Sequence, residues 1–131
     1  MRFALRTDVG CVRALNEDAA YAGENLFVVC DGMGGHNAGE VASAMTVSAL
    51  TQALCAEDVT PGIRALRRAV EEANAGVLQA ASADESRRGM GTTLSALWAD
   101  GESALLAQVG DSRIYLLRGG MLRQCTHDHS M

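Results

Sequence analysis

The sequence predicts an α+β fold in which antiparallel β-sheets are layered with helices. Three observations lead to this prediction: the N-terminal segment favours strands, two amphipathic helical segments follow in succession, and the remainder returns to short strands separated by glycine turns. Strands joined by short turns pair antiparallel, and two consecutive helices cannot each cross over between parallel strands. With 131 residues, of which 48% are apolar, the chain is long enough for one domain or part of one.

The N-terminal strands are predicted from side-chain alternation and turn residues. Residues 3–7 alternate apolar and polar side chains, and residues 19–22 and 26–30 flank the turn-like tripeptide Gly23-Glu24-Asn25. We therefore expect a strand at 3–7 and a β-hairpin over 19–30.

Two amphipathic helices are predicted from apolar residues that recur at steps of three and four. The first begins after Gly39 and ends near Cys55, with an apolar face made by Val41, Ala42, Met45, Ala49 and Ala53. The second has Thr60 as its N-cap and Pro61 at its first helical position. Its apolar face is made by Ile63, Leu66, Val70, Ala73, Val77 and Ala80.

The C-terminal part is predicted to be a β meander that starts after Gly91. The expected strands are residues 92–98, 103–109, 114–117 and 121–125, with turns at Asp100-Gly101 and Gly119-Gly120. We expect the strand at 103–109 to pair antiparallel with the strand at 114–117.

Composition argues against several classes of partner and location. Eleven basic and sixteen acidic residues give a net charge of -5, which disfavours a long contact surface for nucleic acid. No run approaches the ~20 apolar residues that a membrane span needs. Four well-separated cysteines, without a C-x-x-C pair or a signal peptide, are typical of reduced residues in a cytoplasmic protein: Cys11, Cys30, Cys55 and Cys125.

Three acidic clusters are candidates for metal chemistry. Glu17 and Asp18 are adjacent and follow Arg13 by four and five residues; taken alone, a solvated pair is the commoner explanation. Asp31 ends an apolar strand and is followed by a glycine-rich run that lets backbone carbonyl groups approach a cation, although a capping aspartate in a turn is the alternative. Asp111 lies between two apolar strands, where an ordinary turn with an Asp–Arg pair is equally acceptable.

Convergence of these clusters would require cations between them. Two like charges about 5 Å apart repel by roughly 3 kcal/mol at an effective dielectric constant of ~20. Ligand sets made only of oxygen suit Mg²⁺ or Mn²⁺ better than zinc. A dinucleotide-binding loop fits poorly, because the glycine spacing is not G-x-G-x-x-G.

Four motifs in order resemble bacterial phosphatases of the protein phosphatase 2C, or PPM, family. They are TDVGCVRALNED at 7–18, VVCDGMGGHNAGEVAS at 28–43, GMGTTL at 89–94 and GDSRIY at 110–115, and the resemblance runs from Arg6 to Ser130. It implies a layered sandwich of antiparallel sheets flanked by helices, of which residues 1–131 are the N-terminal portion, C-terminally incomplete.

The resemblance also implies a function and a set of site residues. The activity is that of a metal-dependent serine/threonine phosphatase of bacterial signalling, in which metal-activated water hydrolyses phosphoserine or phosphothreonine. The implied cofactors are two or three Mn²⁺ or Mg²⁺ ions in the complete domain. The implied partners are phosphorylated proteins, such as substrates of a serine/threonine kinase, with neither nucleic acid nor membrane. Arg13 would hold the substrate phosphate; the metal ligands would be Glu17, Asp18, Asp31, the Gly32 carbonyl and Asp111.

Two departures from the family pattern leave alternatives open. Met33 stands where relatives of the eukaryotic type have a histidine proposed as general acid, and His36 is either an ordinary loop histidine or a catalytic one. The chain stops at Met131, before the later metal-binding aspartates, and His127 and His129 are expected to be loop residues. The alternative function is therefore a catalytically incompetent phosphatase-like module that binds phosphoproteins or a partner chain, and the coding sequence downstream of Met131 would distinguish the two.

Overall fold

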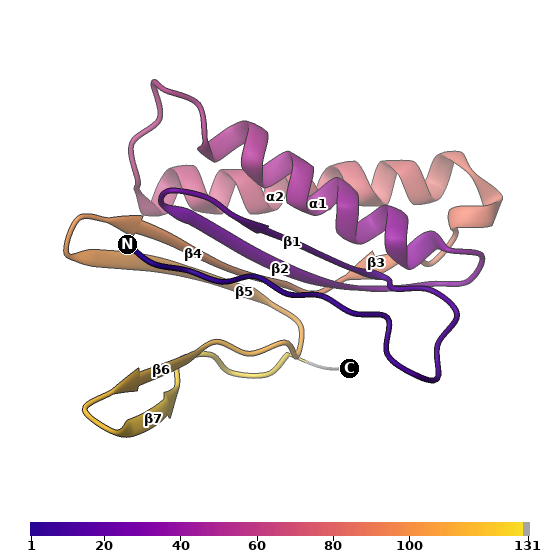
Figure 1. The fold of residues 1–131 in the computed structure, drawn as a ribbon. Helices are drawn as coiled ribbons and strands as arrows, with labels where there is room; N and C mark the ends of the chain where they lie inside the picture. The colour runs from indigo at the N-terminus through magenta and orange to yellow at the C-terminus, as the bar shows by residue number, and fades with distance from the viewer. Residues whose placement is uncertain (130–131) are drawn as a thin grey trace.

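The computed structural model describes residues 1–129 and contains an antiparallel sheet covered on one face by two helices (Figure 1). Its strand order is β1-β2-β4-β5, and the short strand β3 pairs with β2. A separate hairpin, β6 with β7, lies apart from the helices on the other side of the sheet (Figure 1). The elements are β1 Asp18–Ala22, β2 Leu26–Met33, α1 Ala38–Leu54, α2 Ile63–Ala83, the 3₁₀ turn η1 Glu85–Arg87, β3 Gly91–Thr92, β4 Leu94–Asp100, β5 Ser103–Val109, β6 Tyr115–Arg118 and β7 Met121–Gln124.

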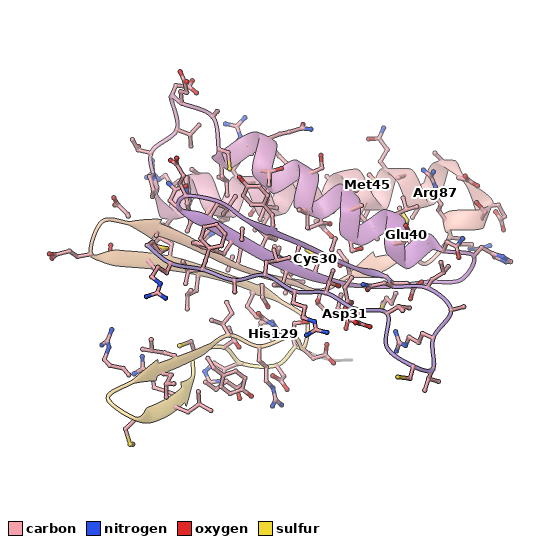
Figure 2. All side chains as sticks on the ribbon, viewed as in Figure 1. Cys30, Asp31, Glu40, Met45, Arg87 and His129 are labelled. Atoms are coloured by element: carbon pink, nitrogen blue, oxygen red, sulfur yellow. The ribbon has the colours of Figure 1, made fainter. Side chains whose placement is uncertain are left out.

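The predicted hairpin over residues 19–30 is confirmed. Strands β1 and β2 pair antiparallel, and the Gly23 N–H closes the turn on the Leu26 carbonyl at 2.9 Å. Alternate residues of β2 face the helices, so Val28 and Cys30 are fully buried whereas Asp31 is exposed on the opposite face (Figure 2). This alternation places Asp31 on the face of the sheet that α1 and α2 leave open.

The first helix is confirmed and ends at Leu54 as predicted, but it begins at Ala38, two residues earlier than predicted, and its buried face differs from the prediction. Residues Ala42, Ser43, Thr46, Leu50 and Leu54 are buried, and most of the predicted face is only half-buried. The reason is that α1 packs against both the sheet and α2, which broadens and rotates its buried face. Two polar residues can be buried there because their hydroxyl groups donate to backbone carbonyl groups, Thr46 to Ala42 at 2.9 Å and Ser43 to Glu17 at 2.6 Å.

The predicted start of the second helix is wrong by two residues. Helix α2 begins at Ile63, and its N-cap is Gly62, whose extended backbone separates Pro61 from the first turn. Leu66, Ala73 and Val77 are buried as predicted, but Ile63 is 66% exposed because it lies in the first turn, beside an open groove between α2 and β5. No helix within residues 1–129 combines the length and apolarity that a membrane crossing requires.

The strand predicted at residues 3–7 is wrong. None of residues 1–17, all of which the structure describes, lies in a strand. The segment 4–8 instead lines a groove beside β1, and the Phe3 ring contacts the Phe27 ring edge-on at a centroid distance of 5.6 Å. Side-chain contacts hold this segment beside the sheet, so its alternating pattern does not report backbone pairing.

The C-terminal strands form where predicted, but one predicted pairing is wrong. Strand β5 pairs with β4 along its whole length and not with β6, which pairs with β7 in the separate hairpin. The chain leaves the edge of β5 at Gly110, whose φ is +91°, and the Gln108 side chain donates to the carbonyl groups of Gly110 and Ser112. These bonds stabilise a turn that directs β6 away from β5.

Candidate metal centre

Two aspartates face each other at one end of the β1–β2 hairpin. Asp18 opens β1, Asp31 lies near the end of β2, and the two are register partners in the antiparallel pair. Partial burial raises the pKa of the Asp31 carboxyl group. The negative charge of the neighbouring Asp18 raises this pKa further, and so does the hydrogen bonding of the Asp18 side chain to Asp31. The hairpin register therefore holds two like charges in contact, as the sequence analysis anticipated for a cation site.

Arg13 and Asp111 lie within electrostatic reach of this pair. The Asp111 carboxylate raises the pKa of Asp31, whereas the Arg13 guanidinium lowers it. A groove of about 500 Å³ opens at this point, with walls from the Arg13 loop and the end of β2. Its lining residues are Arg13, Ala14, Leu15, Glu17, Asp31, Gly32, Met33 and Gly34.

Glu17 joins the site through its backbone as well as its side chain. Its carbonyl group accepts the Gly32 N–H at 3.1 Å and the Ser43 hydroxyl at 2.6 Å, so the loop, β2 and α1 meet at one atom. The contact leaves no room at Gly32, where an added Cβ would lie 1.9 Å from the Gly39 carbonyl oxygen. Gly32 is therefore required for close packing of β2 on α1, a reason that the sequence did not reveal.

The donor set fits a hard divalent cation, although the described residues do not form a complete cage. Within residues 1–129, no three His, Cys, Asp or Glu side chains are close enough together to hold an ion by themselves. The converging side chains are all carboxylates, which suit Mg²⁺ or Mn²⁺ with water completing the coordination. A cation here would also relieve the repulsion that raises the pKa of Asp31.

The histidines lie outside the groove. His36 is exposed in the turn before α1, with a positive φ of 53°, and is not among the lining residues. His127 and His129 are exposed loop residues, and the His129 N–H donates to the Gly110 carbonyl at 2.8 Å. The prediction that His127 and His129 are loop residues is confirmed. Met33, and not a histidine, follows Gly32 and lines the groove.

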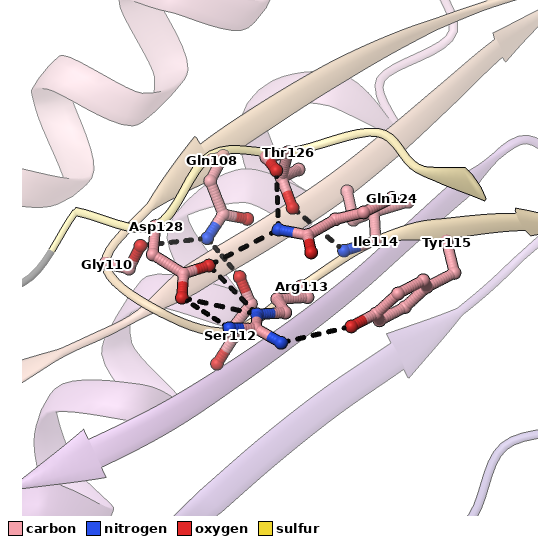
Figure 3. A network of polar contacts seen from close by, with 9 residues as sticks. All are labelled: Gln108, Gly110, Ser112, Arg113, Ile114, Tyr115, Gln124, Thr126 and Asp128. Carbon is pink, nitrogen blue, oxygen red and sulfur yellow. Dashed lines mark hydrogen bonds and ion pairs between the residues drawn. The ribbon is translucent and has the colours of Figure 1, made fainter.

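An Asp111–Arg113 ion pair, one explanation for that turn, is contradicted. Arg113 instead makes a two-pronged contact with Asp128, with nitrogen–oxygen distances of 2.7 and 3.0 Å, and also donates to the Tyr115 hydroxyl (Figure 3). The Arg113 guanidinium lowers the pKa of the Asp128 carboxyl group. Arg113 is thus paired with Asp128, while the charge of Asp111 acts on Asp31.

Thr93, for which the sequence indicates no role, contacts Asp31 directly. The Asp31 N–H donates to the Thr93 hydroxyl, and the Thr93 N–H donates to the Asp31 carbonyl, both at 2.9 Å. The position of Thr93 inside the GMGTTL motif was the only available signal, because a threonine in a strand is otherwise unremarkable.

The fold and the site define a layered α+β protein with clustered carboxylates at one end of an antiparallel sheet. The family model described as protein phosphatase 2C matches residues 12–131, and the chain belongs to this family. The fold class predicted from the sequence is thereby confirmed.

Curated relatives are bacterial serine/threonine phosphatases. The chain is 44% identical to the serine/threonine protein phosphatase PstP of Mycobacterium tuberculosis, over 98% of its own length and 25% of that protein. It is 41% identical to the serine/threonine phosphatase stp of Listeria monocytogenes, over its whole length and 56% of that protein. The chain thus spans between about a quarter and about half of the length of these relatives.

Solved structures that resemble this chain are also of bacterial serine/threonine phosphatases. A crystal structure of the M. tuberculosis phosphatase PstP/Ppp has a TM-score of 0.90 and 45% identity, covering 97% of this chain and 54% of that one. The catalytic domain of PstP in complex with two manganese ions has a TM-score of 0.89 and 45% identity, covering 97% and 55% respectively. Divalent metal dependence is therefore a property of the group to which this chain belongs.

Proposed function

We propose that residues 1–131 are the N-terminal portion of a metal-dependent protein serine/threonine phosphatase domain. The observation that carries the proposal is the placement of Asp18 opposite Asp31 in the β1–β2 register, with Asp111 and Arg13 acting on the same carboxyl group. The names of the relatives and the manganese-bound neighbour support it.

In this proposal the acidic residues hold two or three Mn²⁺ or Mg²⁺ ions in the complete domain. The ligands are the side chains of Glu17, Asp18, Asp31 and Asp111, together with the Gly32 carbonyl group. When bound, a pair of such ions lowers the pKa of a bound water and neutralises the phosphoryl group that is attacked. The chain's own contribution is to hold Asp18 and Asp31 opposite each other at the end of the hairpin, with Arg13 and Asp111 within electrostatic reach.

Arg13 has the second role in the proposal, that of binding the substrate phosphate. Its exposed side chain lines the same groove as Asp31, and a guanidinium fork matches two phosphate oxygens. The substrates would be proteins carrying phosphoserine or phosphothreonine, such as those modified by a serine/threonine kinase. A cytoplasmic location remains a prediction from the sequence.

The test compares Asp31→Asn with Met33→Ala, two changes at the same end of β2. Mn²⁺ affinity is measured by calorimetry, and hydrolysis of p-nitrophenyl phosphate is measured with and without Mn²⁺, on this chain and on any longer product of the same coding sequence. Asp31→Asn should weaken Mn²⁺ binding at least tenfold and abolish most metal-dependent hydrolysis, because it removes a negative charge from the site. Met33→Ala should have a much smaller effect.

Equal losses in the two variants would contradict the role given to Asp31. Metal binding without turnover in every form of the protein would instead support the binding-module alternative, since the carboxylate site would then serve recognition and not hydrolysis.

A further inference from the structure

We propose that Thr93 and Ser112 are positioning residues whose paired hydroxyl groups join the backbone at Asp31 to the loop that carries Asp111, and so set the spacing of these two carboxylates. The inference rests on the proposed function, in which both carboxylates face the same divalent cations. It concerns two side chains that lie outside the groove lining.

The sheet is irregular where β2 faces the junction of β3 and β4. Gly32 is paired with Thr92 and Val29 with Ser95, so the common register places Thr93 opposite Asp31. In an antiparallel ladder every second pair of opposite residues exchanges two backbone hydrogen bonds, and the bond from the Thr93 N–H to the Asp31 carbonyl marks Asp31 and Thr93 as such a pair. Here the Thr93 N–H donates to the Asp31 carbonyl, but the Asp31 N–H donates to the Thr93 side-chain oxygen, each at 2.9 Å.

The Thr93 carbonyl group, which would ordinarily accept the Asp31 N–H, has another partner. It accepts a hydrogen bond from the Thr92 hydroxyl at 2.8 Å. A side-chain hydroxyl thus replaces one backbone acceptor, and the interruption between β3 and β4 falls at this residue. The Thr93 hydroxyl is therefore hydrogen-bonded directly to the backbone of Asp31, a candidate metal ligand.

The same Thr93 hydroxyl is also hydrogen-bonded to Ser112. The Thr93 and Ser112 hydroxyl oxygens lie 2.8 Å apart, and either group can donate while the Thr93 oxygen accepts from the Asp31 N–H. Ser112 immediately follows Asp111 in the chain. Two hydroxyl groups therefore connect the backbone of Asp31 to the loop of Asp111, which is 80 residues further along the chain.

The loop that Thr93 contacts is held in place by hydrogen bonds and close packing. Gln108 donates to the carbonyl groups of Gly110 and Ser112 (Figure 3). Its own side-chain oxygen accepts from the Ser95 hydroxyl at 2.6 Å. The Thr93 methyl group packs on Gly110 so closely that an added Cβ there would lie 2.8 Å from it. A shift of Thr93 would therefore move the Asp111 loop, because the loop has little freedom to adjust by itself.

The experiment separates the hydroxyl group of Thr93 from its shape. Thr93→Val keeps the volume and removes the hydroxyl, Thr93→Ser keeps the hydroxyl, and Ser112→Ala removes the other partner. Thr46→Val is the matched control, because Thr46 also has a buried hydroxyl that donates to a carbonyl group but lies in α1. Far-UV circular dichroism checks that each variant is folded.

Two readouts are used, and the first does not require metal. Amide hydrogen exchange at Asp31 should be at least tenfold faster in Thr93→Val, because its N–H loses its acceptor, and close to wild type in Thr93→Ser and Thr46→Val. Calorimetric Mn²⁺ affinity should fall about tenfold in Thr93→Val and less in Ser112→Ala, with recovery to within about twofold in Thr93→Ser.

Unchanged Asp31 exchange in Thr93→Val would overturn the inference, as would a Thr93→Ser variant as defective as Thr93→Val, since packing alone would then explain the effect. If Thr93→Val does not fold, Ser112→Ala decides: weaker Mn²⁺ binding supports the link and wild-type affinity overturns it. Absence of Mn²⁺ binding to the wild-type protein would count against the proposed function, while the exchange data would still judge the hydroxyl link.

Discussion

Substitution of Gly32 by alanine tests the packing that brings the candidate site together. The added Cβ would lie 1.9 Å from the Gly39 carbonyl oxygen and 2.7 Å from the Glu17 carbonyl oxygen. Optimal contacts between non-bonded atoms are about 3.5–4.0 Å, so β2 and α1 would have to separate by more than about 1 Å. Both obstacles are backbone atoms, and neither can rotate away.

Two contributions determine how much Gly32→Ala lowers the free energy of unfolding. Overpacking costs about 1–3 kcal/mol, and this site belongs at the upper end because only backbone can move. Displacing Gly32 also weakens its N–H bond to Glu17, which contributes about 1 kcal/mol. A total of about 3–4 kcal/mol should lower the melting temperature by roughly 10 °C or more in a chain of this size.

Thermal and urea unfolding followed by circular dichroism measures this loss. The matched control is Gly76→Ala in α2, where an added Cβ meets no atom within 4 Å. That change should stabilise the protein by about 0.5–1 kcal/mol, because alanine is the better helix former. A Gly32→Ala variant that melts within about 3 °C of wild type would refute the proposed contact between β2 and α1.

Two further predictions concern the cysteines and the Arg113–Asp128 ion pair. Burial raises the pKa of the Cys30 thiol to about 12. Ellman's reagent at pH 8 should therefore modify the exposed Cys11 and Cys55 first, and Cys30 only after denaturation. Rapid modification of Cys30 would show that its strand opens readily. The pKa of Asp128 is lowered mainly by its hydrogen bonds from Arg113, so the stabilisation is present above the unfolded pKa and is lost as the pH falls through the lower folded value. A carboxyl NMR titration should give a midpoint for Asp128 below the ordinary value and a rise toward it in Arg113→Ala, whereas equal midpoints would contradict the pairing.

The candidate site illustrates how an antiparallel hairpin concentrates charge. Asp18 and Asp31 are 13 residues apart in the chain, yet the register of β1 with β2 makes them direct neighbours. Partial burial raises the pKa of Asp31 and the charge of Asp18 raises it further, so a nearby opposite charge stabilises the carboxylate form. Arg13 supplies part of it, and a divalent cation is the natural source of the remainder.

Local patterns were sufficient for most of the secondary structure. The hairpin, the presence and end of α1, the buried positions in the middle of α2 and the strand at 103–109 all follow from side-chain periodicity and turn residues. These features depend on interactions between residues close together in the chain, which the sequence displays directly. The acidic residues of the candidate site were also identifiable, because carboxylates at strand ends beside glycine are conspicuous.

Boundaries and pairings that depend on distant partners were the failures. The alternating residues 3–7 lie beside the sheet through side-chain contacts, and Ile63 is exposed because it borders an open groove between α2 and β5. Strand β6 does not join β5, because the Gln108 side chain stabilises a turn that alternation cannot reveal.

By itself, the sequence determined the order of elements, the resemblance to the protein phosphatase 2C family and the identity of the acidic residues. Only the tertiary structure showed that Asp18 lies opposite Asp31, that Gly32 is demanded by contact with Gly39, and that Thr93 links Asp31 to the Asp111 loop. The physical reason is that these three features are contacts between segments far apart in the chain. Their existence depends on sheet register and helix packing, which periodicity within a single segment does not encode.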